Sequence, residues 1–272
     1  MPRRLVGERM DDPSLPAREH AHALAGLARL NTLSGTARAI YRRIAPLAAS
    51  LGRPVTVLDV ATGSGDLPIA LMRRASKDGL MLSCTGCDVS RRALRRAQAR
   101  ARRHGVPLRT VRLDALAEPL PTADVVTCAL FLHHLTDRQA ADLLARMAEA
   151  ADRLLVVSDL RRGAWCTALA AVVPRLTTTS RVVHVDALRS ARAAWTMREL
   201  HALIRDNTEI RDDTNAGRWT FRRALARAYA DHMAASGPSG SFDCDDRRDR
   251  RRTGRLRRGL APGARRPEDH PH

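Results

Sequence analysis

The sequence predicts an α/β protein in which a doubly wound, mainly parallel sheet lies between two layers of helices. Three observations predict this fold class. Short apolar runs alternate about five times with helical patterns, a glycine-rich turn follows the first run, and a hydrophobic content of 44% suffices for a sizeable core. The length of 272 residues fits one large domain with appendages.

The elements follow one another in a regular order. Apolar residues at three- and four-residue spacing predict two helices between residues 13 and 50, interrupted at Ser34 and Gly35. Short apolar runs then predict five strands, and amphipathic spacing predicts helices after the first, second and fourth of them. The predicted strands are 55–60, 80–87, 108–113, 124–132 and 153–158, and the predicted helices are 67–74, 91–104 with Ser90 as N-cap, and 140–151.

The alternation stops after Asp159. The pattern there predicts, in order, a helix at 165–173, a polar irregular segment at 177–186, a helix at 196–204, and a closing pair of strands at 209–213 and 219–222.

The predicted domain organisation has three parts. Residues 1–50 form an N-terminal helical cover, and residues 51–231 form the α/β domain. From residue 232 the composition shifts to arginine, aspartate, serine and glycine, with almost no apolar side chains. Residues 232–272 are therefore predicted to be a disordered tail.

The charge of the chain is strongly positive, with a formal net charge of +18. Such a charge would normally suggest a polyanionic partner. All but one of the 47 basic residues are arginine, the exception being Lys77, and this skew is typical of GC-rich codon usage. Aromatic residues make up only 3%, so bases would find few stacking platforms. We therefore do not expect a nucleic acid partner.

The compartment follows from features that the sequence lacks. No apolar stretch approaches the roughly 18 residues of a membrane span, and residues 1–10 carry no apolar core of a secretory signal. The five cysteines are an odd number spread over a long chain, which indicates reduced thiols. We expect a cytoplasmic protein without a membrane span, and its oligomeric state stays open.

The glycine-rich turn lies in the segment 57–66, where an apolar strand leads into Thr-Gly-Ser-Gly and a helix. Glycine lets a ligand lie against bare backbone near a helix N-terminus. A dinucleotide fingerprint aligned on Gly63 and Gly65 would need a third glycine where Pro68 stands, and a phosphate-binding loop would need a lysine that is missing. These two nucleotide classes are disfavoured.

This turn resembles motif I of the class I S-adenosylmethionine-dependent methyltransferases, and most closely the branch of menaquinone and ubiquinone biosynthesis and small-molecule substrates. The motif departs from the family pattern twice, with Ala61 at the first glycine position and Asp66 just past Gly65. The resemblance implies S-adenosylmethionine as cofactor and a seven-stranded sheet closed by antiparallel strands. It also implies that Asp59, Ala61, Gly63 and Gly65 contact the cofactor.

Further cofactor residues follow at the ends of the later strands. The resemblance implies that Asp88, followed by Val89, accepts hydrogen bonds from the ribose hydroxyls, although a nicotinamide enzyme would use the same acid. It places Asp114 and Ala115 at the adenine and Ala129 at the end of the fourth strand. From the residues alone, an aspartate such as Asp114 is equally a turn former.

Two histidines after the fourth strand, His133 and His134, are the candidate catalytic residues. The resemblance places this segment near the transferred methyl, where a histidine could accept a proton from a phenol. Either histidine could instead merely orient the loop. The methyl group of a sulfonium ion is already activated, so we expect no metal.

The predicted partner is a small-molecule acceptor of a phenolic, quinone-like or polyketide-derived kind. An RNA methyltransferase and a non-enzymatic basic nucleic-acid-binding protein remain the alternatives, both favoured by charge alone.

Some features are better explained by structure than by function. The thiols of Cys84 and Cys87 should point to opposite faces of a strand, and the arginines between 91 and 103 should form a solvated helix face. The three tryptophans, Trp165, Trp195 and Trp219, could anchor packing or line an acceptor pocket.

Overall fold

The structure of the chain is a computed structural model. The chain divides into two units, residues 1–236 and 237–272, and all elements below belong to the first. The structure describes residues 2–12, 14–196, 198–200, 202–203 and 219–221.

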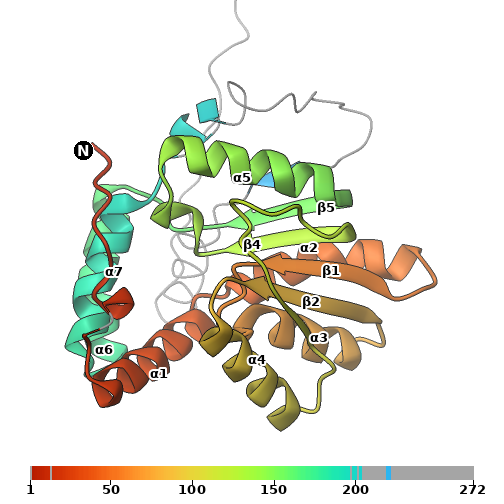
Figure 1. Cartoon of the computed structure of the whole chain (residues 1–272), viewed down its shortest axis with the longest axis horizontal. Helices are drawn as coiled ribbons and strands as arrows, with labels where there is room; N and C mark the ends of the chain where they lie inside the picture. The colour runs from red at the N-terminus through yellow and green to blue at the C-terminus, as the bar shows by residue number, and fades with distance from the viewer. Residues whose placement is uncertain (1, 13, 197, 201, 204–218, 222–272) are drawn as a thin grey trace, which may run out of the picture. The chain divides into compact units, whose positions relative to one another are not determined.

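The described strands form one parallel sheet, which confirms the predicted fold class (Figure 1). Its order is β3-β2-β1-β4-β5-β6, so the chain reverses direction across the sheet between β1 and β4. Ligands of such sheets bind at this switch point, at the carboxyl ends of the strands. The strands are β1 (Val55–Val60), β2 (Leu82–Asp88), β3 (Arg109–Arg112), β4 (Ala123–Ala129), β5 (Ala151–Ser158) and β6 (Trp219–Phe221).

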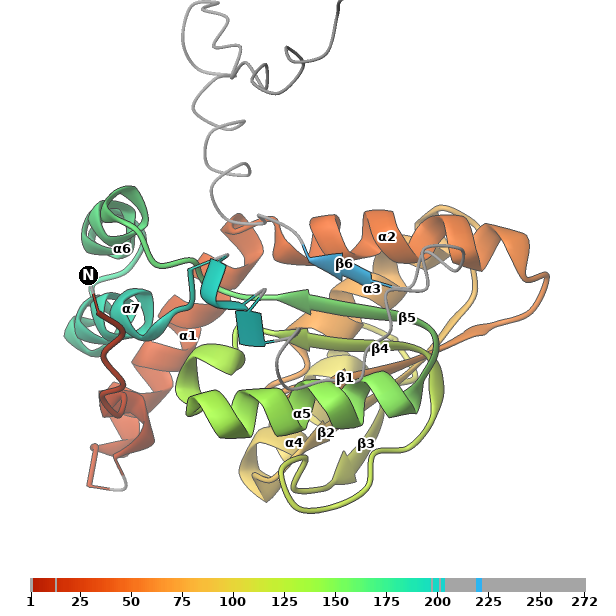
Figure 2. The same ribbon diagram turned by 90° about the horizontal axis from the view of Figure 1, so that it is seen from above.

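Helices cover both faces of the sheet. Figures 1 and 2 show α2 (Thr36–Ser50) and α3 (Asp66–Lys77) on one face and α5 (Asp137–Ala150) on the other. Val55 and Val57 of β1 belong to the core under α2 and α3, whereas Leu58 and Val60 belong to the core under α5. Strand β1 is thus buried on both faces, which explains its continuous apolar run.

The two cysteines of β2 confirm the predicted alternation. Cys84 lies in the core under α2 and α3, and Cys87 lies in the core under α5. Burial raises the pKa of the Cys87 thiol to about 12, so this thiol is protonated at neutral pH.

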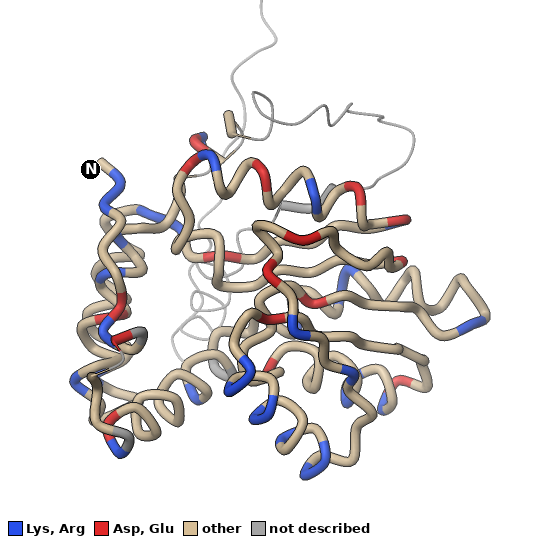
Figure 3. Tube along the Cα trace, viewed as in Figure 1, with Lys and Arg blue, Asp and Glu red and all other residues tan. Residues whose placement is uncertain are grey.

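Helix α4 (Arg91–Arg103) confirms the predicted N-cap and the solvated arginine face. The Ser90 hydroxyl accepts a hydrogen bond from the backbone N–H of Ala93. Leu94, Ala97 and Ala101 are buried, and Figure 3 shows basic positions along this helix. Five of its arginines are exposed, namely Arg91, Arg92, Arg95, Arg102 and Arg103. The spacing of the buried residues is that of an amphipathic helix.

A second layer of structure lies at the carboxyl ends of the strands. It consists of η1 (Arg9–Asp11), α1 (Ala17–Leu33), α6 (Ala164–Thr177) and α7 (Arg181–Ala193), which pack on one another at the left of Figure 1. Helices α1 and α2 confirm the predicted N-terminal pair and its break at Ser34 and Gly35. Among the described residues, no helix is both long and apolar enough to cross a membrane.

One predicted segment is wrong. Residues 177–186 were expected to be polar and irregular, but helix α7 begins at Arg181. Ser180 caps the helix by accepting a hydrogen bond from the N–H of Val183, and Val182 and Val183 are buried. Asp186, a polar residue of this segment, is buried, and its carboxylate accepts hydrogen bonds from the backbone N–H groups of Arg9 and Met10.

The end of the sheet differs from the expectation as well. Strand β6 pairs with β5 in parallel, whereas an antiparallel closing pair was predicted. The long connection after β5 permits the crossover that a parallel pair requires. Over the described residues the sheet has six strands, and the predicted strand at 209–213 and the tail at 232–272 lie outside them. Of the helix predicted at 196–204, residues 198–200 and 202–203 are described and helical.

Candidate active site

The glycine turn after β1 brings bare backbone to the carboxyl edge of the sheet. Ala61, Gly63 and Gly65 all have positive φ, at 54°, 55° and 74°. Left-handed backbone disfavours side chains with a Cβ, which explains why this turn is rich in glycine. A Cβ on Gly65 would lie 3.0 Å from Cβ of Ala97, whereas a Cβ on Gly63 would meet no atom within 4 Å. The backbone at Gly63 is therefore open to a ligand.

Asp59, in β1, holds this turn through a hydrogen bond with Thr62. Its buried carboxylate accepts a hydrogen bond of 2.6 Å from the Thr62 hydroxyl and one of 2.8 Å from the Thr127 hydroxyl. Burial raises the pKa of Asp59 to about 6, although both hydrogen bonds oppose the shift. Asp59 thus ties the turn to β4, and its predicted contact with a cofactor stays a prediction.

Asp88 ends β2 beside the glycine turn. One carboxylate oxygen accepts a hydrogen bond of 2.9 Å from the N–H of Gly63, and the other accepts one of 2.8 Å from the N–H of Ser90. A carboxylate has about four lone-pair directions, so each oxygen can accept a further hydrogen bond. The structure therefore joins two predicted site residues, Gly63 and Asp88, that lie 25 positions apart.

The remaining predicted cofactor residues follow along the same edge. Val89 has 60% of its surface exposed, although it is apolar. Asp114 forms a turn, because its side chain accepts a hydrogen bond of 3.0 Å from the N–H of Leu116. Ala115 is partly buried against the core under α5, and Ala129 ends β4 in register with Ser158 of β5.

His133 lies in the short helix η2 (Leu132–His134) after β4 and is buried. Its Nδ1 lies 2.6 Å from Oδ1 of Asp159, and its backbone N–H donates to Oδ2 of the same carboxylate at 2.9 Å. Burial alone would lower the pKa of His133, but the charges of Asp159 and Glu8 outweigh it and raise the pKa to about 9. The two contacts with Asp159 fix the orientation of the ring.

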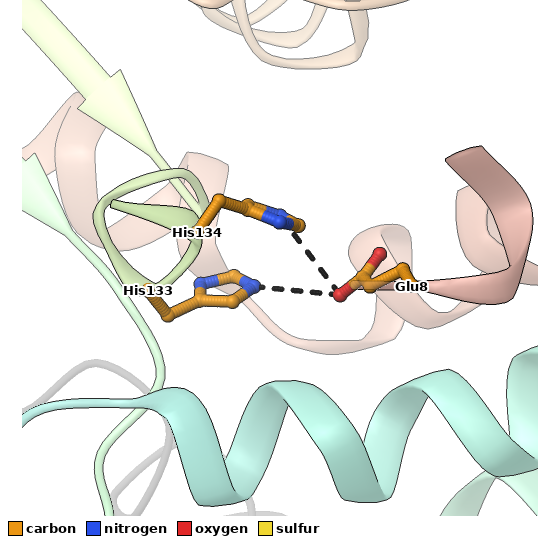
Figure 4. Close-up of side chains that lie close together, drawn as sticks. All are labelled: Glu8, His133 and His134. Atoms are coloured by element: carbon orange, nitrogen blue, oxygen red, sulfur yellow. Dashed lines mark ion pairs between the residues drawn. The ribbon is translucent and has the colours of Figure 1, made fainter. Parts of the chain in front are cut away.

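The carboxylate of Glu8 faces both histidines, as Figure 4 shows. Its Oε1 lies 3.8 Å from Nε2 of His133 and 3.9 Å from Nε2 of His134, and it also accepts a hydrogen bond from the Ser190 hydroxyl. The centroids of the two imidazole rings lie 4.2 Å apart, and the ring planes are tilted by 34°. Burial raises the pKa of Glu8. The contacts with His133, His134 and Ser190 lower it by more, so the pKa of Glu8 lies below its usual value.

Sequence reasoning missed Glu8 and its neighbour Arg3 because their contacts are made far along the chain. The Arg3 guanidinium lies 3.7 Å from the centroid of the Trp195 ring and donates to the carbonyl oxygens of Ala193 and Leu135. The structure thus makes buried Trp195 a packing anchor. Trp165, by contrast, is 73% exposed, and the side chain of Trp219 lies outside the described residues.

Comparisons with known proteins agree with this geometry. Residues 57–152, from β1 to the start of β5, match the family described as "Methyltransferase domain". The fold matches the plantazolicin methyltransferase BamL, solved with a triazolic desmethylPZN analog and SAH, with a TM-score of 0.55. The two chains are 17% identical, over 82% of this chain and 85% of that one. Residues 57–152 form a class I, S-adenosylmethionine-dependent methyltransferase domain.

Relatives of this methyltransferase domain occur among curated proteins. An uncharacterized protein of Mycobacterium tuberculosis is 33% identical over 170 residues, which are 58% of this chain and 59% of the relative. The demethylmenaquinone methyltransferase of Thermus thermophilus is 34% identical over 120 residues, which are 43% of this chain and 53% of that enzyme. The chain thus spans between half and two thirds of the length of these relatives.

Proposed function

We propose that this chain transfers the methyl group of S-adenosylmethionine to a small-molecule acceptor of a phenolic, quinone-like or polyketide-derived kind. One observation carries the proposal: Asp88 holds the N–H of Gly63, so the acid and the open glycine turn share one edge of the methyltransferase domain. The similarity to demethylmenaquinone methyltransferases supports the quinone-like class of acceptor.

The residues along this edge match the parts of the cofactor in order. The free lone pairs of Asp88 would accept hydrogen bonds from the ribose hydroxyls. Exposed Val89 would pack on the adenine ring, and Asp114 with Ala115 would meet its polar edge. Open backbone at Gly63 would let the sulfonium half of the cofactor approach the turn.

The acceptor would meet the methyl group beyond the ends of β4 and β5. Transfer forms a bond from the acceptor atom to the methyl carbon while the bond from carbon to sulfur breaks and its electrons stay on sulfur. Positioning in line is the main requirement of such a displacement.

The second candidate role of the site is proton removal from the acceptor. Nδ1 of His133 faces Asp159, so this ring would have to remove the proton at Nε2, in the fraction of molecules in which the ring is neutral. His134 is the other candidate base.

Titration with S-adenosylhomocysteine tests the cofactor site without knowledge of the acceptor. Loss of hydrogen bonds to a charged acceptor costs about 1.5–3 kcal/mol each, so Asp88→Ala should weaken binding by at least ~10-fold. Asp88→Asn should be milder because it keeps one acceptor oxygen. Asp142→Ala, which removes an exposed carboxylate of α5, is the control and should bind as the wild type does. An unchanged affinity of Asp88→Ala would remove the carboxylate from the site.

The histidines are tested by turnover with phenolic and quinone-like acceptors. If one of them is a general base, its alanine variant should lose roughly 10²-fold in turnover while S-adenosylhomocysteine still binds. Normal turnover of both His133→Ala and His134→Ala would show that neither histidine removes a proton.

A further inference from the structure

The cluster of Glu8, His133 and His134 has the spacing of a metal site. One potential ligand atom of each residue lies within 4.8 Å of the others. The distances of 3.8 and 3.9 Å from Oε1 of Glu8 to the two Nε2 atoms are too long for hydrogen bonds. Two ligands bound at about 2.1 Å to one tetrahedral ion lie about 3.4 Å apart. Each distance from the carboxylate to a ring nitrogen would therefore shorten by about 0.5 Å, and the two ring nitrogens, which lie within 4.8 Å of each other, would approach by at most about 1.4 Å. Figure 4 shows both rings directed at one carboxylate.

Surrounding side chains fix this geometry. Asp159 accepts from the Nδ1 side and from the backbone N–H of His133, so the ring presents Nε2 to Glu8. A carboxylate behind a histidine is the usual outer partner of a metal-binding imidazole, because it fixes the tautomer and the orientation. Ser190 donates to Oε1 of Glu8 and holds that carboxylate in place.

The chemistry of the donors selects the class of ion. Two imidazoles and one carboxylate suit a divalent transition-metal ion such as Zn²⁺. The carboxylates of Glu8 and Asp159 contribute two negative charges, which one divalent cation balances when both histidines are neutral. Three protein ligands leave a fourth position of a tetrahedral ion open, as in catalytic rather than structural sites.

We propose that Glu8, His133 and His134 bind one divalent transition-metal ion whose open position accepts an oxygen of the acceptor. The binding of the ion stands by itself, whereas its role rests on the proposed function. An acceptor hydroxyl bound to the ion would lose its proton to solvent more readily, and the resulting oxygen would attack the methyl carbon. The ion would then take the place of a histidine base.

Metal titration of the full chain, freed of metal with a chelator and carrying no histidine tag, tests the proposal. Calorimetry with Zn²⁺ should show one tight site per chain, and Co²⁺ should give the visible absorption bands of a tetrahedral nitrogen and oxygen site. Glu8→Gln and His134→Ala each remove a proposed ligand and should weaken binding by at least about 10-fold. Loss of a mere outer partner of a ligand already costs about that much. Both variants keep the pair of His133 and Asp159, which favours folding.

Matched controls separate this site from other side chains. Glu19→Gln on α1 and His104→Ala at the end of α4 change exposed residues of the same types and should leave Zn²⁺ affinity unchanged. Asp159→Asn should weaken binding by about 10- to 100-fold, since it removes the outer partner. Circular dichroism confirms that each variant is folded.

Two outcomes would overturn the proposal: absence of a tight Zn²⁺ site in the wild type, or equal affinities in wild type, ligand variants and controls. Titration of the same metal-free protein with S-adenosylhomocysteine keeps the two proposals apart. Binding of S-adenosylhomocysteine without binding of Zn²⁺ would refute only the metal site. Binding of Zn²⁺ without S-adenosylhomocysteine would refute the cofactor site and leave the metal site standing.

Discussion

Substitution of Gly63 by alanine distinguishes two effects: the cost of backbone strain to stability, and the loss of open space against which a ligand could bind. Gly63 has φ +55°, and its new Cβ would meet no protein atom within 4 Å. Left-handed backbone costs a residue with a Cβ roughly 1–2 kcal/mol, and the lower entropy of the unfolded alanine chain returns about 0.4–1 kcal/mol. Gly63→Ala should therefore lower the free energy of unfolding by only about 1 kcal/mol, measured by urea denaturation.

The control is Gly79→Ala. Gly79 has φ +69°, an equally open surrounding, and a position at the end of α3 remote from the turn. Both variants should lose the same stability, but only Gly63→Ala should bind S-adenosylhomocysteine at least ~10-fold more weakly, because under the proposed function its new methyl group would occupy space next to the cofactor.

A third variant tests the packing part of the argument. A Cβ on Gly65 would lie 3.0 Å from Cβ of Ala97 and 3.1 Å from Cδ2 of Leu108. Gly65→Ala should therefore lose about 1–3 kcal/mol more stability than Gly63→Ala, because overpacking adds to the strain. If Gly63→Ala bound S-adenosylhomocysteine as tightly as Gly79→Ala, the cofactor would not lie against Gly63, and the reasoning would fail.

Three further predictions concern stability. Ala61→Gly should raise the free energy of unfolding by about 0.5–1 kcal/mol, since φ is 54° there, and a lower value would contradict the strain. Asp124→Asn should cost about 2 kcal/mol in urea denaturation, because Arg53 donates two hydrogen bonds to that carboxylate; a loss below about 0.5 kcal/mol would refute this. The folded pKa of Asp59, about 6, exceeds its unfolded value of 3.8, so its charge costs stability as pH rises through 4–6, by about 3 kcal/mol above pH 6. Asp59→Asn should flatten that decline in the free energy of unfolding between pH 4 and 7. An unchanged profile would show that the charge of Asp59 does not cause the decline.

The sequence predicted the first five strands because β1, β4 and β5 are largely apolar runs, and because β2 and β3 fall in the regular alternation of strands with predicted helices. Pro54 and the glycine turn bound β1, and Ser90 marks the start of α4 with its own side chain. These signals are local, so one chain suffices to find them. The glycine turn and Asp88 were found together for the same reason, since both lie where predicted strands end.

What the sequence did not predict depends on contacts between distant positions. His133 and Asp159 are 26 positions apart, and Glu8 and Ser190 are 182 apart, so no local pattern links them. The direction of β6 was missed because an apolar strand looks the same whether it runs parallel or antiparallel. The start of α7 was missed because the segment 177–186 is polar in sequence, and the burial of Asp186 in it depends on hydrogen bonds from the distant backbone of Arg9 and Met10.

The contacts of the N-terminal segment also set the order in which the site can be assembled during synthesis. Glu8 leaves the ribosome early, whereas Ser190, which holds its carboxylate, follows 182 residues later. Until then Glu8 lacks the Ser190 hydroxyl, and the backbone N–H groups of Arg9 and Met10 lack the carboxylate of Asp186. Charged side chains such as Arg3 and Glu8 suit this segment to wait in water without aggregating. The β1 turn can form before Ser190 fixes the carboxylate that faces the two histidines, so under the proposed function the cofactor side of the site would mature ahead of the acceptor side.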